Sequence, residues 1–494
     1  MGASSIQHVF VLMLENRAFD HMLGFSGISG QDAATGETTR INGLSGIESN
    51  TFQGQVYKVS STADFVMPAD PGHEFPNVLN QLCGMMATYH SGGAYPAIDG
   101  SGFVGSYAAS GGGSSPGEIM KCFSAAQLPV LNALAQEFVV CDNWHASMPG
   151  PTWPNRMFVH AASSGGLDHS PSVAEIAEWE AIDGFQFAKG TIYDALKAKG
   201  VPWRLYGGDS FPMVAALKGI RLEDIRSFDH FTSDLGQANY PYSYVFIEPS
   251  YDVLNDYENS TSQHPLTDIT LGEGLIKATY EAIRTSEFWT SSMLIITWDE
   301  HGGFYDHAVP PAAPAPGDTV PGSKNNQFGF TFQQYGPRVP ALVISPLCPR
   351  NLIDHRLYDH TSILATLERL FGLNPLTARD ASANPLDSLV TLTTPRDTPA
   401  TAPSPANFAG AVGAETQAMA ARSTEVGIAS RAEETVNQGN LPGVLQSALR
   451  QDLQISLSTQ KQAILDRVRS IQTRGQAEQY LAEVRQKVAA APGR

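Results

Sequence analysis

The chain has 494 residues, of which 42% are hydrophobic, so a large buried core is expected and a wholly disordered chain is excluded. The formal net charge is −18, from 31 basic and 49 acidic residues, which disfavours binding to nucleic acid or to an anionic membrane surface. The four cysteines show no CxxC spacing, which argues against a zinc finger or a dense disulfide scaffold.

Strand-like and helix-like segments alternate through the first 400 residues, which predicts an α/β fold. Three short apolar runs have the pattern of buried parallel strands, at residues 9–14, 138–141 and 293–297. Helical spacing is visible at residues 275–283, and another helix is expected to start at Thr361 or Ser362.

Two proline-rich stretches divide the chain. Residues 308–322 contain five prolines and are expected to form a loop, and residues 394–406 have the composition of a linker. After the linker, residues 460–472 and 476–490 space their apolar side chains as helices do. We therefore expect a catalytic domain at 1–395, and at 396–494 a linker with a helical extension that packs on the body or joins two copies of the chain.

Polar residues follow each predicted strand. Glu15 and Asn16 follow the first, Asp299 and Glu300 come shortly after the third, and the segment containing Thr152 follows the second. Open α/β sheets bind ligands at the carboxyl ends of their strands. A single polar strand end is commonly just solvated, but adjacent polar pairs at two ends favour a site.

The residue types at these ends indicate a chemistry. Three carboxylates gathered with the Asn16 amide would repel one another unless a hard divalent cation lay among them. Thr152 lies between two prolines, in a rigid turn, and a nearby metal would lower the cost of ionising its hydroxyl. A hydroxyl and a metal in an acidic pocket suit displacement at phosphorus. Arg156 could pair with a phosphate oxygen, although a structural ion pair is the simpler interpretation.

Several motifs in order resemble those of the bacterial phosphoesterase family, which contains phospholipases C and acid phosphatases and belongs to the alkaline-phosphatase superfamily. The resemblance covers about residues 6–375, and its two most specific motifs are ENRAFDHMLG at 15–24 and TWDEHGGFYDHAVPP at 297–311. The others are DPGHEF at 70–75, PTWPNR at 151–156, HP at 264–265, GPRVPALVISP at 336–346 and YDHTSILATLER at 358–369.

The resemblance implies an α/β/α sandwich with a mostly parallel central sheet of the alkaline-phosphatase type. It implies that the metal ligands are Glu15, Asn16, Thr152, Asp299 and Glu300, with Thr152 also the nucleophile. It implies that His73 and His264 contact phosphate or donate a proton.

Other residues of the motifs have simpler interpretations. His301, Asp306 and His307 are expected to brace the glycine turn of the second motif. Asp359 and His360 precede a helix, so capping accounts for them most simply.

The leading hypothesis is a metal-dependent phospholipase C that cleaves phosphatidylcholine-type diesters through a phosphothreonine. One alternative is an acid phosphatase acting on phosphomonoesters, and another is a non-catalytic binding or scaffold protein on the same fold. The metal could be Ca²⁺, Mg²⁺, Mn²⁺ or Zn²⁺. The expected partner is a phospholipid or small phosphoester, with no nucleic acid and no transmembrane segment. No N-terminal signal is visible, so we expect a cytoplasmic protein or one exported by a signal-independent route.

Overall fold

A sheet of ten strands forms the centre of the computed structural model, which describes residues 6–178, 184–318, 324–406, 431–437 and 439–490. In spatial order the strands are β3 (Thr38–Arg40), β2 (Ser29–Asp32), β12 (Leu352–Asp354), β6 (Val139–Cys141), β11 (Ala341–Ile344), β10 (Ser292–Trp298), β1 (His8–Leu14), β9 (Tyr244–Glu248), β7 (Trp203–Gly207) and β8 (Ile225–Ser227). β11 is antiparallel to both its neighbours and β3 to β2, whereas the remaining pairs are parallel. The predicted mostly parallel sheet is therefore confirmed, and β1, β6 and β10 lie where the apolar runs predicted strands.

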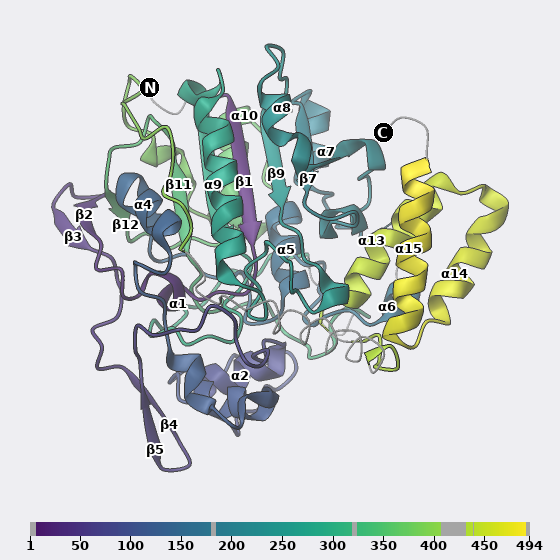
Figure 1. Ribbon diagram of the computed structural model, residues 1–494, viewed down its shortest axis with the longest axis horizontal. Helices are drawn as coiled ribbons and strands as arrows, with labels where there is room; N and C mark the ends of the chain where they lie inside the picture. The colour runs from purple at the N-terminus through teal and green to yellow at the C-terminus, as the bar shows by residue number, and fades with distance from the viewer. Residues whose placement is uncertain (1–5, 179–183, 319–323, 407–430, 438, 491–494) are drawn as a thin grey trace, which may run out of the picture.

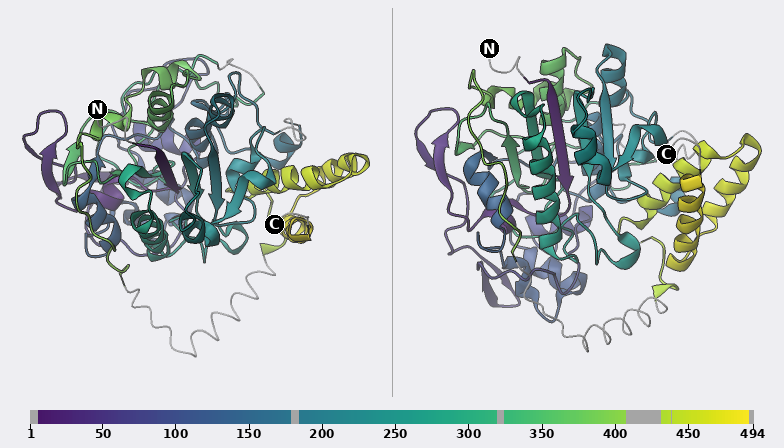
Figure 2. Two further views of the ribbon diagram at one scale, coloured as in Figure 1. Left: turned by 90° about the horizontal axis from the view of Figure 1, so that it is seen from above. Right: turned by 45° about the horizontal axis from the view of Figure 1, so that its top comes forward.

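Helices cover both faces of the sheet, as an α/β/α sandwich requires (Figures 1 and 2). One face carries α4 (Pro129–Glu137), α8 (Phe231–Leu235) and α9 (Ile269–Thr285), and Phe10 of β1 meets Phe231 of α8 edge to face. The other face carries α5 (Thr152–Ala161), α7 (Ile192–Lys199) and α10 (Thr361–Phe371). The predicted helix at 275–283 lies within α9, and α10 begins at the predicted residue.

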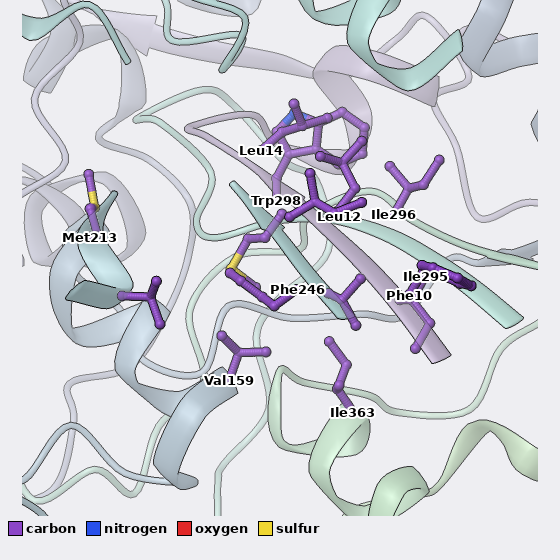
Figure 3. Packing of buried hydrophobic residues seen from close by; sticks show 14 of the residues in the cluster. Phe10, Leu12, Leu14, Val159, Met213, Phe246, Ile295, Ile296, Trp298 and Ile363 are labelled. Atoms are coloured by element: carbon purple, nitrogen blue, oxygen red, sulfur yellow. The ribbon is translucent and has the colours of Figure 1, made fainter. Parts of the chain in front are cut away.

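The core follows from the alternation of side chains along the central strands. Every residue of β1 and β10 is buried, because helices lie against both faces of these strands. Figure 3 shows side chains of β1 and β10 packed with Phe246 of β9, Val159 of α5 and Ile363 of α10.

A smaller lobe lies below the carboxyl ends of the strands in Figure 1. It contains the hairpin of β4 (Ser49–Phe52) and β5 (Gln55–Lys58) together with α2 (Phe75–Cys83) and α3 (Phe103–Tyr107). The remaining short helices of the body are α1 (Phe19–Leu23), α6 (Val173–Glu178) and α11 (Ala378–Ser382). Single helical turns are η2 (Ala108–Gly112), η3 (Pro116–Met120), η4 (Met213–Ala216), η5 (Leu222–Asp224), η6 (Phe228–His230), η7 (Val253–Asn255), η8 (Trp289–Ser291), η9 (Leu386–Leu389) and η10 (Ser458–Gln460).

The C-terminal extension is helical, as predicted, and stands at one side of the molecule (Figures 1 and 2). It consists of α13 (Leu441–Ile455), α14 (Lys461–Arg469) and α15 (Arg474–Ala490). Its apolar side chains belong to the same buried cluster as those of the central sheet. Within the described residues, no helix combines the length and the apolar character needed to cross a bilayer.

The proline-rich stretch predicted as a linker is held along α9 over its described part. The backbone carbonyls of Thr398, Pro399 and Ala402 accept hydrogen bonds from Arg284, Tyr280 and Lys277 of α9. The carbonyl oxygens of this irregular stretch have no secondary-structure partner, and side-chain donors of α9 supply one. The boundary between 395 and 396 stays a prediction.

Candidate active site

The parallel pairing of β1 and β10 brings the first two polar segments together. Leu14 lies opposite Trp298, so Glu15 and Asn16 leave the sheet beside Asp299 and Glu300. The two segments stay joined after the strands end, because the Arg17 amide donates to the Glu300 carbonyl at 2.9 Å. The Asn16 amide donates to Asp299 Oδ1 at 3.0 Å.

Thr152, the first residue of α5, contacts this pair of strand ends. Its Oγ1 donates to Asn16 Oδ1 at 3.2 Å, and the side chain is 1% exposed. The turn before it is held by Asn155, whose Nδ2 donates to the carbonyls of Gly150 and Pro151 at 2.9 and 3.0 Å. The hydroxyl therefore lies at the positive end of a helix dipole and beside an acidic cluster.

Arg156 forms an ion pair, as the simpler of its two interpretations predicted. Its Nε lies 2.8 Å from Asp299 Oδ2, and its Nη2 donates to the Leu14 carbonyl at 2.9 Å. Burial raises the pKa of Asp299 to about 6 even though Arg156 counteracts the rise. Burial and the charge of Asp299 together raise the pKa of Glu15 to about 8. The pocket is thus electronegative enough that a cation would stabilise its ionised form.

Two carboxylate oxygens in the pocket have no hydrogen-bond donor. Glu15 Oε2 and Glu300 Oε1 are buried and unpartnered, whereas Glu15 Oε1 and Glu300 Oε2 accept bonds from Asn440 and from the Gly302 amide. An unpaired buried carboxylate oxygen is costly, and a bound cation would remove that cost. The donor types, which are carboxylate, amide and hydroxyl oxygens, therefore suit a hard divalent metal. Among the described residues, the carboxylates of Glu15, Asp299 and Glu300 do not form a group with three oxygens within 4.8 Å of one another.

His73 reaches the same site from the loop before α2. Its Nε2 is 3.4 Å from Asn16 Nδ2, and its Nδ1 is 2.9 Å from the Pro71 carbonyl. Burial alone would lower the pKa of His73, but the neighbouring carboxylates of Glu300 and Asp70 raise it to about 9. These carboxylates therefore favour the charged form of the His73 imidazole.

His264 lies behind His73, with their ring centroids 6.4 Å apart. It stacks on Tyr257 at 3.5 Å, and its Nε2 is 3.6 Å from Asp70 Oδ1. Burial lowers the pKa of His264 well below its usual value, and the positive charge of His73 lowers it further. The neighbouring carboxylates thus favour the charged form of His73, whereas burial favours the neutral form of His264.

Among the described residues, one cluster brings three potential metal-ligand atoms within 4.8 Å of one another. It consists of Asp20, Asp306 and His307. Arg338 already occupies it, with Nη2 3.0 Å from Asp20 Oδ1 and Nε 2.9 Å from Asp306 Oδ1. His307 Nδ1 is 2.7 Å from Asp20 Oδ2, and the Asp20 amide donates to Asp306 Oδ2 at 3.2 Å. All four carboxylate oxygens are satisfied, so this network braces the first and second motifs against each other.

His301 also braces the turn, through an Nε2 contact of 2.8 Å with Gln81 Oε1. The capping interpretation of Asp359 and His360 is wrong, because α10 receives no side-chain cap. His360 Nε2 instead lies 2.6 Å from the Asp299 carbonyl, and Asp359 accepts a hydrogen bond from Ser147 at 2.9 Å. These residues support the loops that carry Asp299 and Thr152.

Asp70 and Asn440 were missed by the sequence reasoning. Asp70 lies in the DPGHEF motif, where its proximity to His73 could have indicated a role, and burial raises its pKa to about 6. Asn440 donates from Nδ2 to Glu15 Oε1 at 2.7 Å. No sequence pattern marks Asn440, since an isolated asparagine in a polar stretch is ordinary.

Comparison with known proteins finds relatives that match most of the chain. Non-specific phospholipase C6 of Arabidopsis thaliana is 36% identical over 427 residues, which cover 81% of this chain and 75% of the relative. Non-specific phospholipase C3 of the same plant is 34% identical over 421 residues, covering 81% and 77%. Phospholipase C B of Mycobacterium tuberculosis is 27% identical over 447 residues, covering 79% of each chain.

Among solved structures, a protein in the alkaline phosphatase superfamily from Vibrio parahaemolyticus matches 52% of this chain and 66% of its own, with 17% identity and a TM-score of 0.32. That score is too low to support an argument. The model of the Phosphoesterase family, in contrast, matches residues 6–374. The chain therefore belongs to the Phosphoesterase family and is a phosphoric ester hydrolase.

Proposed function

We propose that the protein is a metal-dependent phospholipase C that cleaves phosphatidylcholine-type phosphodiesters through a phosphothreonine at residue 152. The observation that carries the proposal is the hydrogen bond from Thr152 Oγ1 to Asn16 Oδ1 at 3.2 Å, beside buried carboxylates with unpartnered oxygens. A hydroxyl beside a bound metal would be easier to ionise, which is how weak hydroxyl nucleophiles are activated.

Glu15, Asn16, Thr152, Asp299 and Glu300 would hold the metal, as their oxygen-rich donor set suits Ca²⁺, Mg²⁺, Mn²⁺ or Zn²⁺. When bound, the metal would lower the cost of ionising the threonine hydroxyl and of gathering charge at phosphorus. Arg156 keeps Asp299 ionised and in position through its 2.8 Å ion pair.

The side chains then perform a double displacement. The Thr152 oxygen, ionised after its proton has passed to solvent, bonds to phosphorus while the bond from phosphorus to the glycerol oxygen breaks. That glycerol oxygen takes a proton from the charged form of His73. Water next attacks the phosphothreonine, the bond from phosphorus to Thr152 Oγ1 breaks, and the neutral His73 takes one proton of that water. The phosphorylated head group leaves, Thr152 returns to its ionised form and His73 to its charged form.

Similarity to proteins named phospholipase C supports the diester over the monoester. The same nucleophile and carboxylates would also serve a phosphomonoester, so acid phosphatase is the second outcome that an experiment must separate. A non-catalytic scaffold is disfavoured, since each position of the site retains a reactive residue type.

The test is a panel of p-nitrophenyl phosphate, p-nitrophenyl phosphorylcholine and phosphatidylcholine vesicles, with and without EDTA. We expect diester cleavage to exceed monoester cleavage and to disappear with EDTA. Thr152→Ala should lower kcat about 10³-fold or more, whereas Thr152→Ser, which keeps a hydroxyl, should retain measurable turnover. Preference for the monoester would make the protein a phosphatase, and substantial turnover by Thr152→Ala would remove Thr152 as nucleophile.

A further inference from the structure

The C-terminal extension reaches into the active site at a single side chain. Asn440 lies outside residues 6–374 of the family match and 425 residues along the chain from Glu15, yet the two are hydrogen-bonded. We propose that Asn440 is a positioning residue that fixes the Glu15 carboxylate for metal binding, so that the extension completes the active site. The inference rests on the metal site of the proposed function.

The geometry of the contact is that of an outer partner to a metal ligand. Asn440 Nδ2 donates to Glu15 Oε1 at 2.7 Å, and both side chains are buried, with 4% and 0% of their surface exposed. The other oxygen, Oε2, stays without a donor. Metal-binding carboxylates are commonly held in this way, with one oxygen on a neighbouring donor and the other free for the cation.

The chemistry of an amide suits this position. An amide NH₂ can only donate, so it orients the carboxylate while leaving its negative charge in place. A lysine or arginine would also donate, but its positive charge would compete with the cation.

Close packing fixes the position of Asn440, which directly precedes α13. Gly443, in the first turn of α13, lies so close to the indole of Trp153 that a Cβ there would overlap the ring. Trp153 follows Thr152 in α5, so the start of α13 is seated against the helix that carries the proposed nucleophile. Only a residue without a side chain permits this approach.

The extension also supports the loop that holds the second histidine. Tyr257, on which His264 stacks, belongs to a loop in which Asp252, Asp256 and Tyr257 all have positive φ angles. Arg474 at the start of α15 donates from Nη2 to the Val253 carbonyl at 2.7 Å. Non-glycine residues in this conformation persist only when their surroundings hold them, and Arg474 is part of those surroundings.

The experiment measures metal binding by calorimetry on protein stripped with EDTA, with no substrate present, for the wild type, Asn440→Ala and Asn437→Ala. Asn437 is the matched control, because it lies on the same segment but its Oδ1 accepts from the Val173 amide at 3.0 Å, away from the site. We expect Asn440→Ala to weaken metal affinity about 10- to 100-fold and Asn437→Ala to leave it unchanged. Hydrogen exchange in α13 should stay protected in both variants, which would show that the extension remains docked.

Rescue provides the second measurement. With p-nitrophenyl phosphorylcholine, the kcat of Asn440→Ala should approach that of the wild type at saturating metal, since the ligands themselves remain. Unchanged metal affinity in Asn440→Ala would overturn the inference. Activity above that of the wild type would also overturn it, because Asn440 would then hinder the reaction. An equal loss in Asn437→Ala would assign the effect to docking of the extension and would also overturn it.

The two proposals fail separately. A wild-type protein that binds metal but prefers monoesters would contradict the diester assignment and leave the role of Asn440 intact. A wild-type protein that binds no metal would contradict both.

Discussion

At the scale of single residues, Asn16 connects the groups to which the proposed mechanism gives a role. Its amide N–H bonds Asp299, its side-chain oxygen accepts from Thr152, and its side-chain nitrogen lies beside His73. Its φ of 57° is left-handed, a conformation that asparagine tolerates better than most residues. A tight turn directly after β1 places the backbone N–H of this residue at a carboxylate and its side chain at a hydroxyl and an imidazole.

Arg156→Met tests the pairing that keeps Asp299 charged. Because the substitution leaves a buried carboxylate without its partner, we expect the free energy of unfolding to fall by about 3–5 kcal/mol. Chemical denaturation at pH 7 measures this. Arg221→Met is the control, since its ion pair with Glu223 has side chains 60% and 67% exposed and should change stability by less than about 1 kcal/mol. Equal effects of the two substitutions would contradict the role assigned to Arg156.

At the scale of elements, the segment that follows α5 contains the buried His169 and its neighbour Asp168. This segment holds the loop at residues 327–328 through hydrogen bonds. His169 Nε2 is 2.8 Å from Glu175 Oε1, and its Nδ1 is 3.1 Å from Asp168 Oδ1. Asp168 also accepts from the amides of Gln327 and Phe328 at 2.8 and 2.9 Å. The charge on this imidazole therefore affects how firmly the loop is held.

The stability that His169 contributes should depend on pH. Burial would lower its pKa, but the bonds to Asp168 and Glu175 raise it to about 9, above its value of 6.5 in an unfolded chain. The stabilisation is then complete below pH 6.5 and is lost as the pH rises through 9. We expect His169→Gln to lower the free energy of unfolding by about 2–3 kcal/mol at pH 6 and by far less at pH 10, as measured by urea unfolding. A cost that does not change with pH would contradict this assignment.

The close packing of α13 against α5 gives a second prediction at this scale. Gly443→Ala should lower the free energy of unfolding by about 1–3 kcal/mol, because the added Cβ overlaps Trp153. Gly274→Ala in α9 is the matched control, since a Cβ there meets no atom within 4 Å and alanine favours a helix by about 0.5–1 kcal/mol. Thermal unfolding measures the stability of both variants. Unchanged stability in Gly443→Ala would show that α13 and α5 pack less closely than described.

Sequence reasoning predicted the local parts of this structure well and the long-range parts poorly. Strands β1, β6 and β10 were predictable because continuous apolar runs of that length are typical of strands buried on both faces. The contact between Asn16 and Thr152 agrees with the predicted cluster at the strand ends. The antiparallel insertion of β11 was not predictable, since the direction of a strand depends on pairing with distant segments.

The same reason explains the residues that were missed. Asn440 has meaning only through its contact with Glu15, 425 residues away, and no local periodicity encodes such a pairing. The true partner of His360, the Asp299 carbonyl, is a backbone atom from another loop, so the residue before α10 resembled a cap.

At the scale of the whole molecule, buried negative charge and stability are coupled. Glu15 and Asp299 are buried together with raised pKa values of about 8 and about 6, so the native state without a cation retains unfavourable electrostatics. A metal that binds only the native state stabilises it by about 4 kcal/mol at a free concentration one thousand times its dissociation constant.

Removal of metal should therefore lower the midpoint of thermal unfolding by several degrees, and calorimetry with and without EDTA measures the change. Glu300→Gln, which removes the charge of one proposed metal ligand, should show a smaller EDTA effect than the wild type. An unchanged midpoint in the wild type would contradict the presence of a native-state metal site.

The central claim is that Thr152 becomes covalently bonded to phosphorus during the cleavage of a phosphodiester. The most direct test is rapid acid quenching of the enzyme during turnover of p-nitrophenyl phosphorylcholine, followed by mass spectrometry of its peptides. We predict a phosphocholine adduct on the peptide that contains Thr152 and its absence from Thr152→Ala. An adduct on any other residue, or steady turnover with no adduct at all, would contradict the account.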